Sequence, residues 1–268
     1  MSHSKRTIVL VHGLWVTPLC WEHFKRHYEA LGHEVVAPAW PGIKGDAAAM
    51  RRDPSGLNGV GAAEVIDHYA RIIRGLPEPP IIIGHSYGGV ITQVLIDKGL
   101  GAAGVAIDSV PPKGIYILPV STYLALLPSF LKPGTFWGTF LFTLPQFWKV
   151  FANTLSETEV RKEYERQAIP ASGRSIFQAA LANLMPDAPT AVNFRNAKRP
   201  PLLLIGGEKD VIMPSALNRK NFRKYRGPAV TAFKEFPGRS HYIIAEKGWE
   251  EVADHALQWA ESSIASDR

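Results

Sequence analysis

Cysteine is almost absent from this sequence. Cys20 is the only one among 268 residues, so the chain cannot form an internal disulfide or a metal site built from several cysteines. Such sparing use of cysteine is typical of a reducing compartment, and we expect a cytoplasmic location. A chain of this length buries about three quarters of its unfolded surface. It therefore needs neither a disulfide nor a metal ion for stability.

A strong charge bias is also missing. Charged residues make up 20% and hydrophobic residues 46% of the sequence, which excludes intrinsic disorder, collagen and coiled coil. The net charge of +6 is mildly basic. We interpret the densest run of cations as the solvated face of a helix and expect no nucleic-acid partner; a nucleic-acid or lipid-surface patch is the alternative. The run consists of Arg219, Lys220, Arg223, Lys224 and Arg226.

The chain has no long apolar run without a helix breaker. The first run, Ile8–Val11, is shorter than the roughly 7 to 15 residues of an export signal, so we predict none. Residues 114–131 and 133–148 carry no charge, but proline and glycine would repeatedly interrupt a spanning helix there. We expect short helices that form a lid over an apolar pocket, without stable membrane insertion; peripheral membrane contact is the alternative. The interrupting residues are Pro119, Pro128, Pro133, Pro145, Gly134 and Gly138.

Strand-like and helix-like segments alternate on both sides of this apolar middle. This alternation predicts an α/β fold with a mostly parallel, doubly wound sheet and helices on both faces. Residues 1–112 and 191–268 would form the core, and residues 113–190 would be a helical lid insertion. The expected strands are 7–11, 34–37, 81–83, 104–107, 202–205 and 230–233, and the expected helices are 21–31, 60–73, 88–97, one after Ser215, and 249–260.

The most specific motif is Gly84-His85-Ser86-Tyr87-Gly88, between a predicted strand and a predicted helix. A G-x-S-x-G sequence in that context is a nucleophile elbow, in which small residues let the serine occupy a strained turn. Ser86 is therefore the candidate nucleophile. The backbone N–H of Tyr87 would lie at the start of the helix, where it can stabilise an oxyanion.

A serine nucleophile needs a general base that is oriented by a carboxylate. Asp210 follows the strand 202–205, and His241 follows the strand 230–233, in the chain order that an elbow fold requires. We predict that His241 is the base and Asp210 the acid. Asp108, which follows the strand 104–107, is the rival acid.

Two further candidates near the acid and the base are weaker. Glu208 precedes Asp210 in the same loop and is the less favoured carboxylate. His255 is the only other histidine after Asp210, and it falls inside the last predicted helix, where we expect a surface role.

The loop after the first strand should supply the second oxyanion donor. Gly13 permits a sharp turn, so the N–H of Leu14 is predicted to point into the site. Trp15 is predicted to contact substrate as a wall of the pocket, or to contribute its amide instead. His12 is expected to hydrogen-bond the loop and not to act as a second base.

These motifs resemble those of the α/β-hydrolase superfamily, in particular small bacterial hydrolases and plant-type methylesterases. The resemblance covers both flanks of the chain and implies a Ser-His-Asp mechanism without cofactor or metal. The sequence departs from the superfamily pattern in two ways. The chain begins too close to Thr7 to hold the antiparallel strands that open larger members, so about six core strands are expected. It also lacks the H-G-G-G loop of lipase-like relatives. The matching motifs are HGLW at 12–15, GHSYGG at 84–89, GGEKD at 206–210 and GRSH at 238–241.

We therefore predict a cofactor-independent serine hydrolase that cleaves a small or medium apolar carboxylic ester or a lactone. The alternatives are amide or carbon–carbon bond hydrolysis or cyanohydrin cleavage by the same triad, and a ligand-binding homologue without activity. Because the elbow carries serine, dehalogenase and epoxide hydrolase activity are not expected. A homodimer is left open. Aromatic residues of the insertion would line a pocket or fill the lid core: Tyr116, Tyr123, Phe130, Phe136, Trp137, Phe140, Phe142, Phe147 and Trp148.

Overall fold

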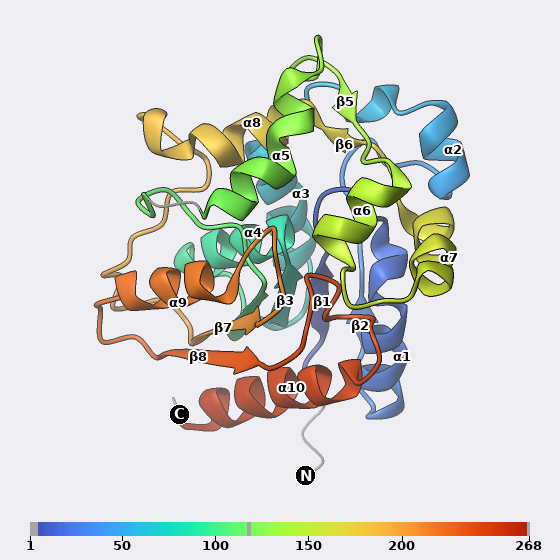
Figure 1. Ribbon diagram of the computed structural model, residues 1–268. Helices are drawn as coiled ribbons and strands as arrows, with labels where there is room; N and C mark the ends of the chain where they lie inside the picture. Colours follow the sequence, from blue (N-terminus) through green and yellow to red (C-terminus); the bar gives the residue numbers. More distant parts are fainter. Residues whose placement is uncertain (1–4, 117–118, 267–268) are drawn as a thin grey trace.

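A six-stranded parallel sheet forms the centre of the molecule. The computed structural model describes residues 5–116 and 119–266. The strand order is β2-β1-β3-β4-β7-β8, and every neighbouring pair is parallel, as the alternation predicted. The expected six core strands are thereby confirmed. The strands are β1 (Ile8–Val11), β2 (Val35–Val36), β3 (Ile81–His85), β4 (Ala103–Ile107), β7 (Leu202–Gly207) and β8 (Thr231–Phe236) (Figure 1).

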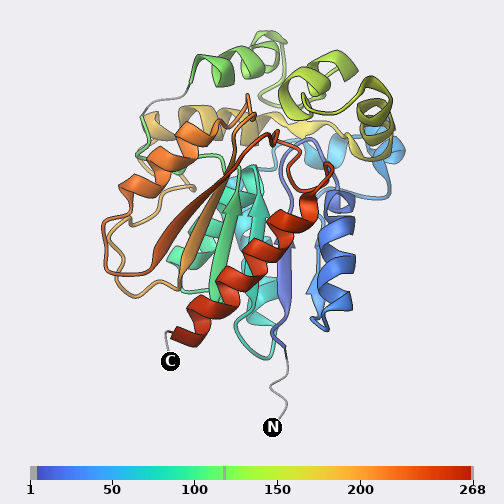
Figure 2. The ribbon, with the colours of Figure 1, turned by 60° about the horizontal axis from the view of Figure 1, so that its bottom comes forward.

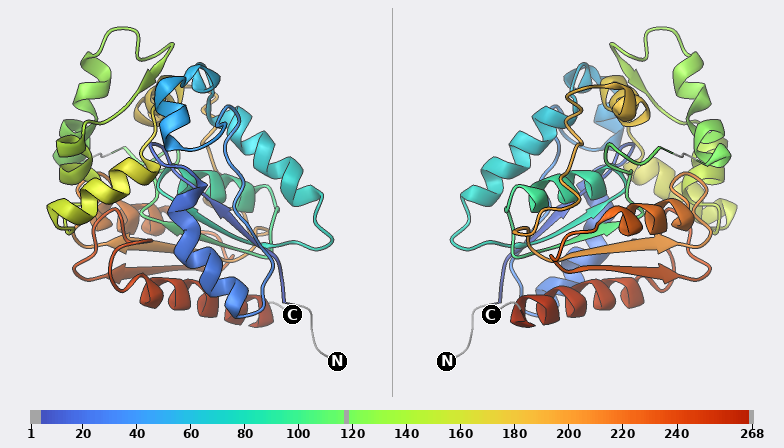
Figure 3. Two further views of the ribbon diagram at one scale, coloured as in Figure 1. Left: turned by 90° about the vertical axis from the view of Figure 1, so that its right-hand side faces the viewer. Right: turned by 90° about the vertical axis from the view of Figure 1, so that its left-hand side faces the viewer.

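Helices cover both faces of this sheet (Figures 2 and 3). On one face, α1 (Glu22–Ala30) packs on α10 (Trp249–Ser266), where the Tyr28 hydroxyl donates to the Ala253 carbonyl at 2.9 Å. The other face carries α3 (Ala62–Arg74), α4 (Tyr87–Asp97) and α9 (Ser215–Lys224). The Asn221 amide of α9 donates to Gln93 of α4 at 3.0 Å. Every residue of β1, β3, β4 and β7 is buried, as aliphatic strands covered on both faces require.

The apolar middle of the chain forms short helices at the end of the sheet where the strands finish (Figure 1). They are attached to the loop after β1, because the Trp15 indole donates to the Phe140 carbonyl at 3.0 Å and Ile169 N–H donates to the Trp15 carbonyl at 2.9 Å. The elements are α5 (Val120–Leu131), β5 (Thr139–Phe140), α6 (Leu144–Phe151), α7 (Glu157–Gln167), β6 (Ala171–Ser172) and α8 (Gly173–Leu181), with β5 and β6 antiparallel.

Four short elements complete the chain. They are the helix α2 (Ala47–Arg52) and the 3₁₀ turns η1 (Pro18–Trp21), η2 (Ser55–Leu57) and η3 (Ala182–Leu184). The sequence analysis did not predict α2, because its six residues are too few to display a helical period.

Two of the expected helix breakers lie inside helices. Pro145 stands in the first turn of α6, where proline is tolerated. Pro128 lies inside α5 although we expected it to break a helix. It stands in the last turn, where the missing N–H and the crowding of the carbonyl one turn earlier affect only the end of the helix. Within residues 5–116 and 119–266, no helix is both long and apolar enough to cross a membrane.

The aromatic residues of the apolar middle of the chain are divided between interior and surface. Phe140, Phe142 and Phe147 are buried in the core. Four others are exposed, although we expected these aromatic residues to line a pocket or to fill the core of a lid. They are Tyr116, Tyr123, Phe136 and Trp137.

Candidate active site

The elbow holds Ser86 in a backbone conformation that non-glycine residues rarely adopt. Its φ is 56° and its ψ is −118°, at the junction of β3 and α4. The flanking glycines are required by close approach. A β-carbon added at Gly88 would lie 2.0 Å from the Val11 carbonyl oxygen, and one at Gly84 would lie 2.1 Å from the Gly88 carbonyl oxygen. The motif therefore places Ser86 at the carboxyl edge of the sheet.

Asp210 and His241 form a buried pair at the same edge. Nδ1 of His241 lies 2.6 Å from one carboxylate oxygen of Asp210, and both side chains are fully buried. The other carboxylate oxygen accepts hydrogen bonds from the N–H groups of Ile212 and Met213, both at 2.8 Å. Because a carboxylate only accepts, Nδ1 carries the proton, and Nε2 is left as the basic nitrogen.

The Nε2 atom of His241 is buried and has no hydrogen-bond partner among the described residues. The Ser86 hydroxyl is consequently not bonded to it in this structure. The two residues nevertheless belong to one cluster, because the ring of His85, which precedes Ser86, lies 4.6 Å from the ring of His241.

His85 is a residue whose contribution the sequence analysis missed. Its Nε2 lies 2.7 Å from the main-chain carbonyl oxygen of His241, to which it donates. Burial, together with the neighbouring His241 imidazole, keeps the pKa of His85 well below its usual range, so the ring is neutral. His85 thus ties the elbow to the loop that carries the candidate base. The only hint in the sequence was its place inside the elbow motif.

Glu246 fixes the same loop from the other side and was also missed. One of its oxygens accepts from the N–H of Ser240 at 3.0 Å, and the other accepts from the Ser240 hydroxyl at 2.9 Å. Thr154 donates to this carboxylate as well. Burial raises the pKa of Glu246 above its ordinary value. No sequence motif marks a residue that acts five positions beyond the histidine.

Asp108, the rival acid, is buried close by but makes different contacts. One oxygen accepts from the N–H of Gly207 at 2.7 Å, and the other has no partner among the described residues. Burial, reinforced by the neighbouring Asp210 carboxylate, holds the pKa of Asp108 well above its usual range. The His241 imidazole therefore donates its hydrogen bond to Asp210 and not to Asp108.

The loop after β1 lies directly against the elbow. A β-carbon added at Gly13 would lie 2.8 Å from the Ser86 β-carbon, so only glycine fits there. Trp15 adopts a φ of 65°, which reverses the backbone just after Leu14. In the part of the chain that the structure describes, neither the Leu14 nor the Tyr87 N–H donates to another loop or turn carbonyl. Both amides therefore remain candidates for an oxyanion.

Two residues of this loop have further contacts. Trp15 is buried, lines a narrow cavity with Gly13 and Leu14, and packs on Phe142 with 4.5 Å between ring centroids. His12 accepts from the Trp40 N–H at 3.2 Å through Nε2. Its Nδ1 therefore donates to the Gly13 carbonyl at 2.9 Å. Burial lowers the pKa of His12 to about 4, so it acts as a neutral support of the loop.

The remaining predicted residues lie away from this cluster. Glu208 is exposed and accepts from the Gly238 N–H at 2.8 Å. His255 is half-buried on α10, 5.7 Å from the Phe236 ring. Among the cations of α9, Arg219 stacks on Phe233 and pairs with Glu235 at 3.2 Å, so part of that run has intramolecular partners.

A metal ion would have one set of donors near the elbow. Within the described ranges, only one group of three histidine, cysteine, aspartate or glutamate side chains has its possible metal-binding atoms within 4.8 Å of one another. The group consists of His85, Asp108 and His241. However, Nε2 of His85 and Nδ1 of His241 are already engaged in hydrogen bonds.

A parallel sheet with a serine elbow at its carboxyl edge defines the class of α/β proteins with hydrolase-type architecture. The chain belongs to the alpha/beta hydrolase family, whose profile matches residues 8–255. Among curated proteins it resembles Methylesterase 8 of Arabidopsis thaliana, with 32% identity over 97 residues that cover 35% of this chain and 33% of that protein. The match thus spans about a third of that relative's length.

Solved structures confirm the fold. The monoacylglycerol lipase of Paleococcus ferrophilus has a TM-score of 0.67 and 22% identity, covering 96% of this chain and 94% of that one. A methylesterase from Arabidopsis has a TM-score of 0.65 and 16% identity, covering 96% and 99%.

Proposed function

We propose that this protein is a serine hydrolase that cleaves small or medium apolar carboxylic esters, or lactones, through an acyl-enzyme. The observation that carries the proposal is the fully buried hydrogen bond between His241 and Asp210, beside a strained serine elbow. Two curated relatives are named methylesterases, which supports ester substrates.

In the proposed mechanism, Ser86 attacks the substrate carbonyl while Nε2 of His241 accepts its proton. Asp210 holds the imidazole in the tautomer that leaves Nε2 basic. The N–H groups of Leu14 and Tyr87 stabilise the tetrahedral oxyanion, and loss of one such donor costs about 3–4 kcal/mol of transition-state stabilisation. His241 then protonates the leaving alkoxide and activates the water that hydrolyses the acyl-enzyme. Substrate binding draws the Ser86 hydroxyl onto Nε2, since catalytic hydrogen bonds often tighten only in the complex.

The apolar character of the substrate follows from what surrounds the elbow. Phe151 of α6 lies edge-on to the His241 ring at 4.6 Å, and Trp15 with Phe142 supplies a second aromatic wall. These side chains offer few polar groups for a charged substrate. In this proposal residues 113–190 act as the lid, and their movement admits the ester.

The test is a profile of nitrophenyl esters of increasing chain length and of lactones, measured on the wild type and on Ser86→Ala. We expect turnover of short and medium esters and a near-complete loss in Ser86→Ala, with an unchanged circular dichroism spectrum. Activity only on amides, carbon–carbon bonds or cyanohydrins would replace the ester proposal while keeping the triad. Turnover that persists in Ser86→Ala would show that Ser86 is not the nucleophile and that the proposed triad mechanism is wrong.

A further inference from the structure

The lid helix α5 has the reverse of the polarity expected of a surface helix. Its buried side includes Thr122 and Ser129, whose hydroxyls donate to the carbonyls of Ile212 and Leu126, both at 2.6 Å. Its outward side, which we call the exposed α5 face, is wholly apolar or aromatic. That face consists of Val120 (73% exposed), Tyr123 (53%), Leu124 (64%), Leu127 (43%) and Leu131 (71%).

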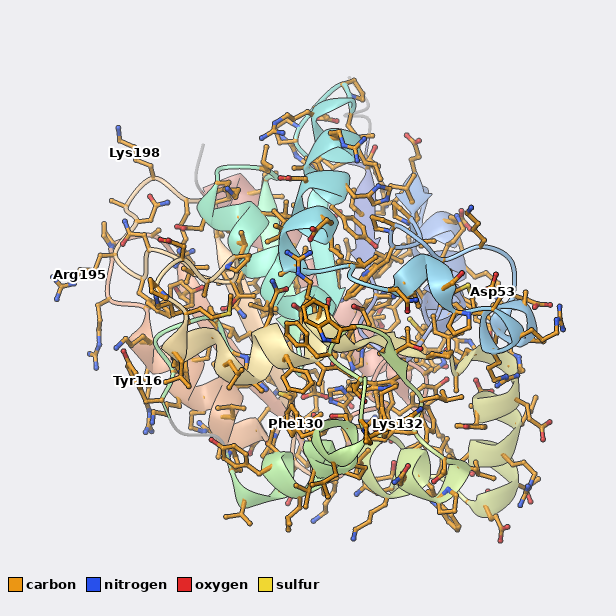
Figure 4. All side chains as sticks on the ribbon, turned by 90° about the horizontal axis from the view of Figure 1, so that it is seen from above. Asp53, Tyr116, Phe130, Lys132, Arg195 and Lys198 are labelled. Atoms are coloured by element: carbon orange, nitrogen blue, oxygen red, sulfur yellow. The ribbon has the colours of Figure 1, made fainter. Side chains whose placement is uncertain are left out.

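The spacing of these residues places them along one side of the helix, because positions 120, 124, 127 and 131 follow the helical repeat. A surface helix normally turns such a stripe toward the core. Here the core side is already filled, since Ala125 and Leu126 are buried. Figure 4 shows α5 at the outer edge of the molecule, where Phe130 and Lys132 mark its C-terminal end.

A further exposed aromatic group is connected to α5 through ring contacts, because Phe177 packs on both Phe130 of α5 and Phe136. Trp137, which follows α5, is 79% exposed and packs edge-on against Phe136 at 4.6 Å. Tryptophan at the boundary of an apolar surface is typical of proteins that contact the polar–apolar interface of a bilayer.

Along the sequence, the charges on either side of α5 all have one sign. Residues 109–156 contain no aspartate or glutamate, and their only charged residues are Lys113, Lys132 and Lys149. Lys132 is exposed and immediately follows α5. A lysine beside an apolar helix face can keep its ammonium group in water while its methylenes contact lipid. An anionic surface complements this arrangement.

We propose that the exposed α5 face, with Trp137 and Lys132, binds peripherally to an anionic lipid surface with α5 lying in the plane of the interface. Four of the five side chains of the face are aliphatic and offer no directional hydrogen bonds for recognising a protein. The face is also much smaller than the roughly 20–30 residues per partner of a standard protein interface. At 12 residues, α5 is shorter than the ~20 residues that a spanning helix needs, so it binds the surface only.

This inference goes beyond the proposed function and does not depend on it. It does have a consequence for the site, because Thr122 of α5 is bonded to Ile212, two residues after Asp210. A lipid surface that holds α5 would therefore lie close to the loop that carries the candidate acid.

The test is flotation of the full chain with vesicles of phosphatidylcholine and phosphatidylglycerol (7:3), and with phosphatidylcholine alone. The face is disrupted by combining Leu124→Gln with Leu131→Gln. The matched control combines Leu31→Gln with Val230→Gln, two exposed apolar residues (41% and 52%). They precede β2 and β8 and so lie at the amino ends of the strands, away from the carboxyl ends where α5 lies. Thermal unfolding checks that both variants fold.

We expect the wild type and the control to float with the anionic vesicles. The apparent partition constant should fall at least 10-fold in the α5 double variant. Lys132→Ala should weaken binding to anionic vesicles by about 2-fold or more at low salt while leaving binding to neutral vesicles unchanged. Failure of the wild type to float would overturn the proposal. So would undiminished flotation of the α5 double variant, which would move binding to another surface such as α9.

Light scattering separates lipid binding from self-association. We expect the α5 double variant and the wild type to have the same oligomeric state. If the wild type is a dimer that the double variant converts to a monomer, and vesicles bind neither, the face is an interface between two copies and the proposal is wrong.

Discussion

At Asp210 and Asp108, two buried carboxyl groups lie side by side in different chemical states. Asp210 accepts three hydrogen bonds and is fully satisfied as a carboxylate. Asp108 accepts one, leaves an oxygen without a partner among the described residues, and has a raised pKa. An ionised carboxylate is costly to bury without partners, so the surroundings of Asp108 favour its protonated form.

These states predict opposite effects of the same substitution. Asp210→Asn should lower kcat/KM by roughly 10³–10⁴-fold, because the amide no longer selects the useful tautomer of His241. Asp108→Asn should change kcat/KM by less than about 5-fold, since an amide resembles the protonated acid in shape and can still accept from Gly207. Steady-state kinetics on one ester decide this. A collapse of activity in Asp108→Asn with near-normal activity in Asp210→Asn would exchange the two roles.

His12 makes the fold sensitive to acid. Its pKa is about 4 in the folded chain and about 6.5 when unfolded, so between these values the unfolded chain binds the proton and the folded chain does not. Stability from His12 is therefore complete above pH 6.5 and is lost as the pH falls toward 4. The loss amounts to about 3 kcal/mol. Urea unfolding of the wild type and His12→Asn at pH 7, 5.5 and 4 measures this loss. The free energy of unfolding should fall less steeply with decreasing pH in the variant. If the free energy of unfolding depended on pH equally in the two proteins, His12 would be protonated in the folded state.

At the scale of elements, a side chain of α2 holds the end of α7. The Arg51 guanidinium donates to the carbonyls of Tyr164, Glu165 and Ala168 at 3.0, 2.7 and 3.1 Å. Tyr164 and Glu165 lie in the last turn of α7 and Ala168 is its C-cap residue, a region where carbonyls lack the N–H groups of a following turn. The Tyr164 carbonyl also accepts from the Ala168 N–H at 3.0 Å. A cation there also complements the helix dipole.

Arg51→Gln should therefore loosen α7 without disturbing the sheet. We expect a loss of about 1–3 kcal/mol of stability, because several charge-assisted hydrogen bonds disappear from a half-buried position. Hydrogen exchange should be faster in α7 and unchanged in β3. The adjacent Arg52→Gln is the control, since Arg52 is exposed, and it should stay within about 0.5 kcal/mol. Equal effects of the two substitutions would deny the capping role.

At the scale of the whole molecule, the parts of the fold that local sequence could predict are those with a local cause. The buried aliphatic strands and the position of the elbow motif between a strand and a helix can be recognised from a few consecutive residues, although the close approach that requires Gly88 involves the distant Val11 carbonyl. Asp210 and His241 could be named because a parallel sheet brings the ends of its strands to one edge.

Other features depend on contacts between distant segments. The carbonyl that His85 bonds is 156 residues away in sequence, so the motif did not reveal that role. The outward turn of Leu124 and Leu131 depends on what already fills the other side of α5, and no period in the sequence reports that. For the same reason the insertion's aromatic residues could not be sorted into buried and exposed.

The proposed function requires that Ser86 is a nucleophile activated by His241. Reaction of the full chain with a fluorophosphonate, followed by intact-mass measurement and peptide mapping, tests it most directly. We expect a single adduct on Ser86 in the wild type, none in Ser86→Ala, and labelling at least about 10³-fold slower in His241→Gln. An adduct on another residue, or labelling of His241→Gln as fast as the wild type, would contradict it.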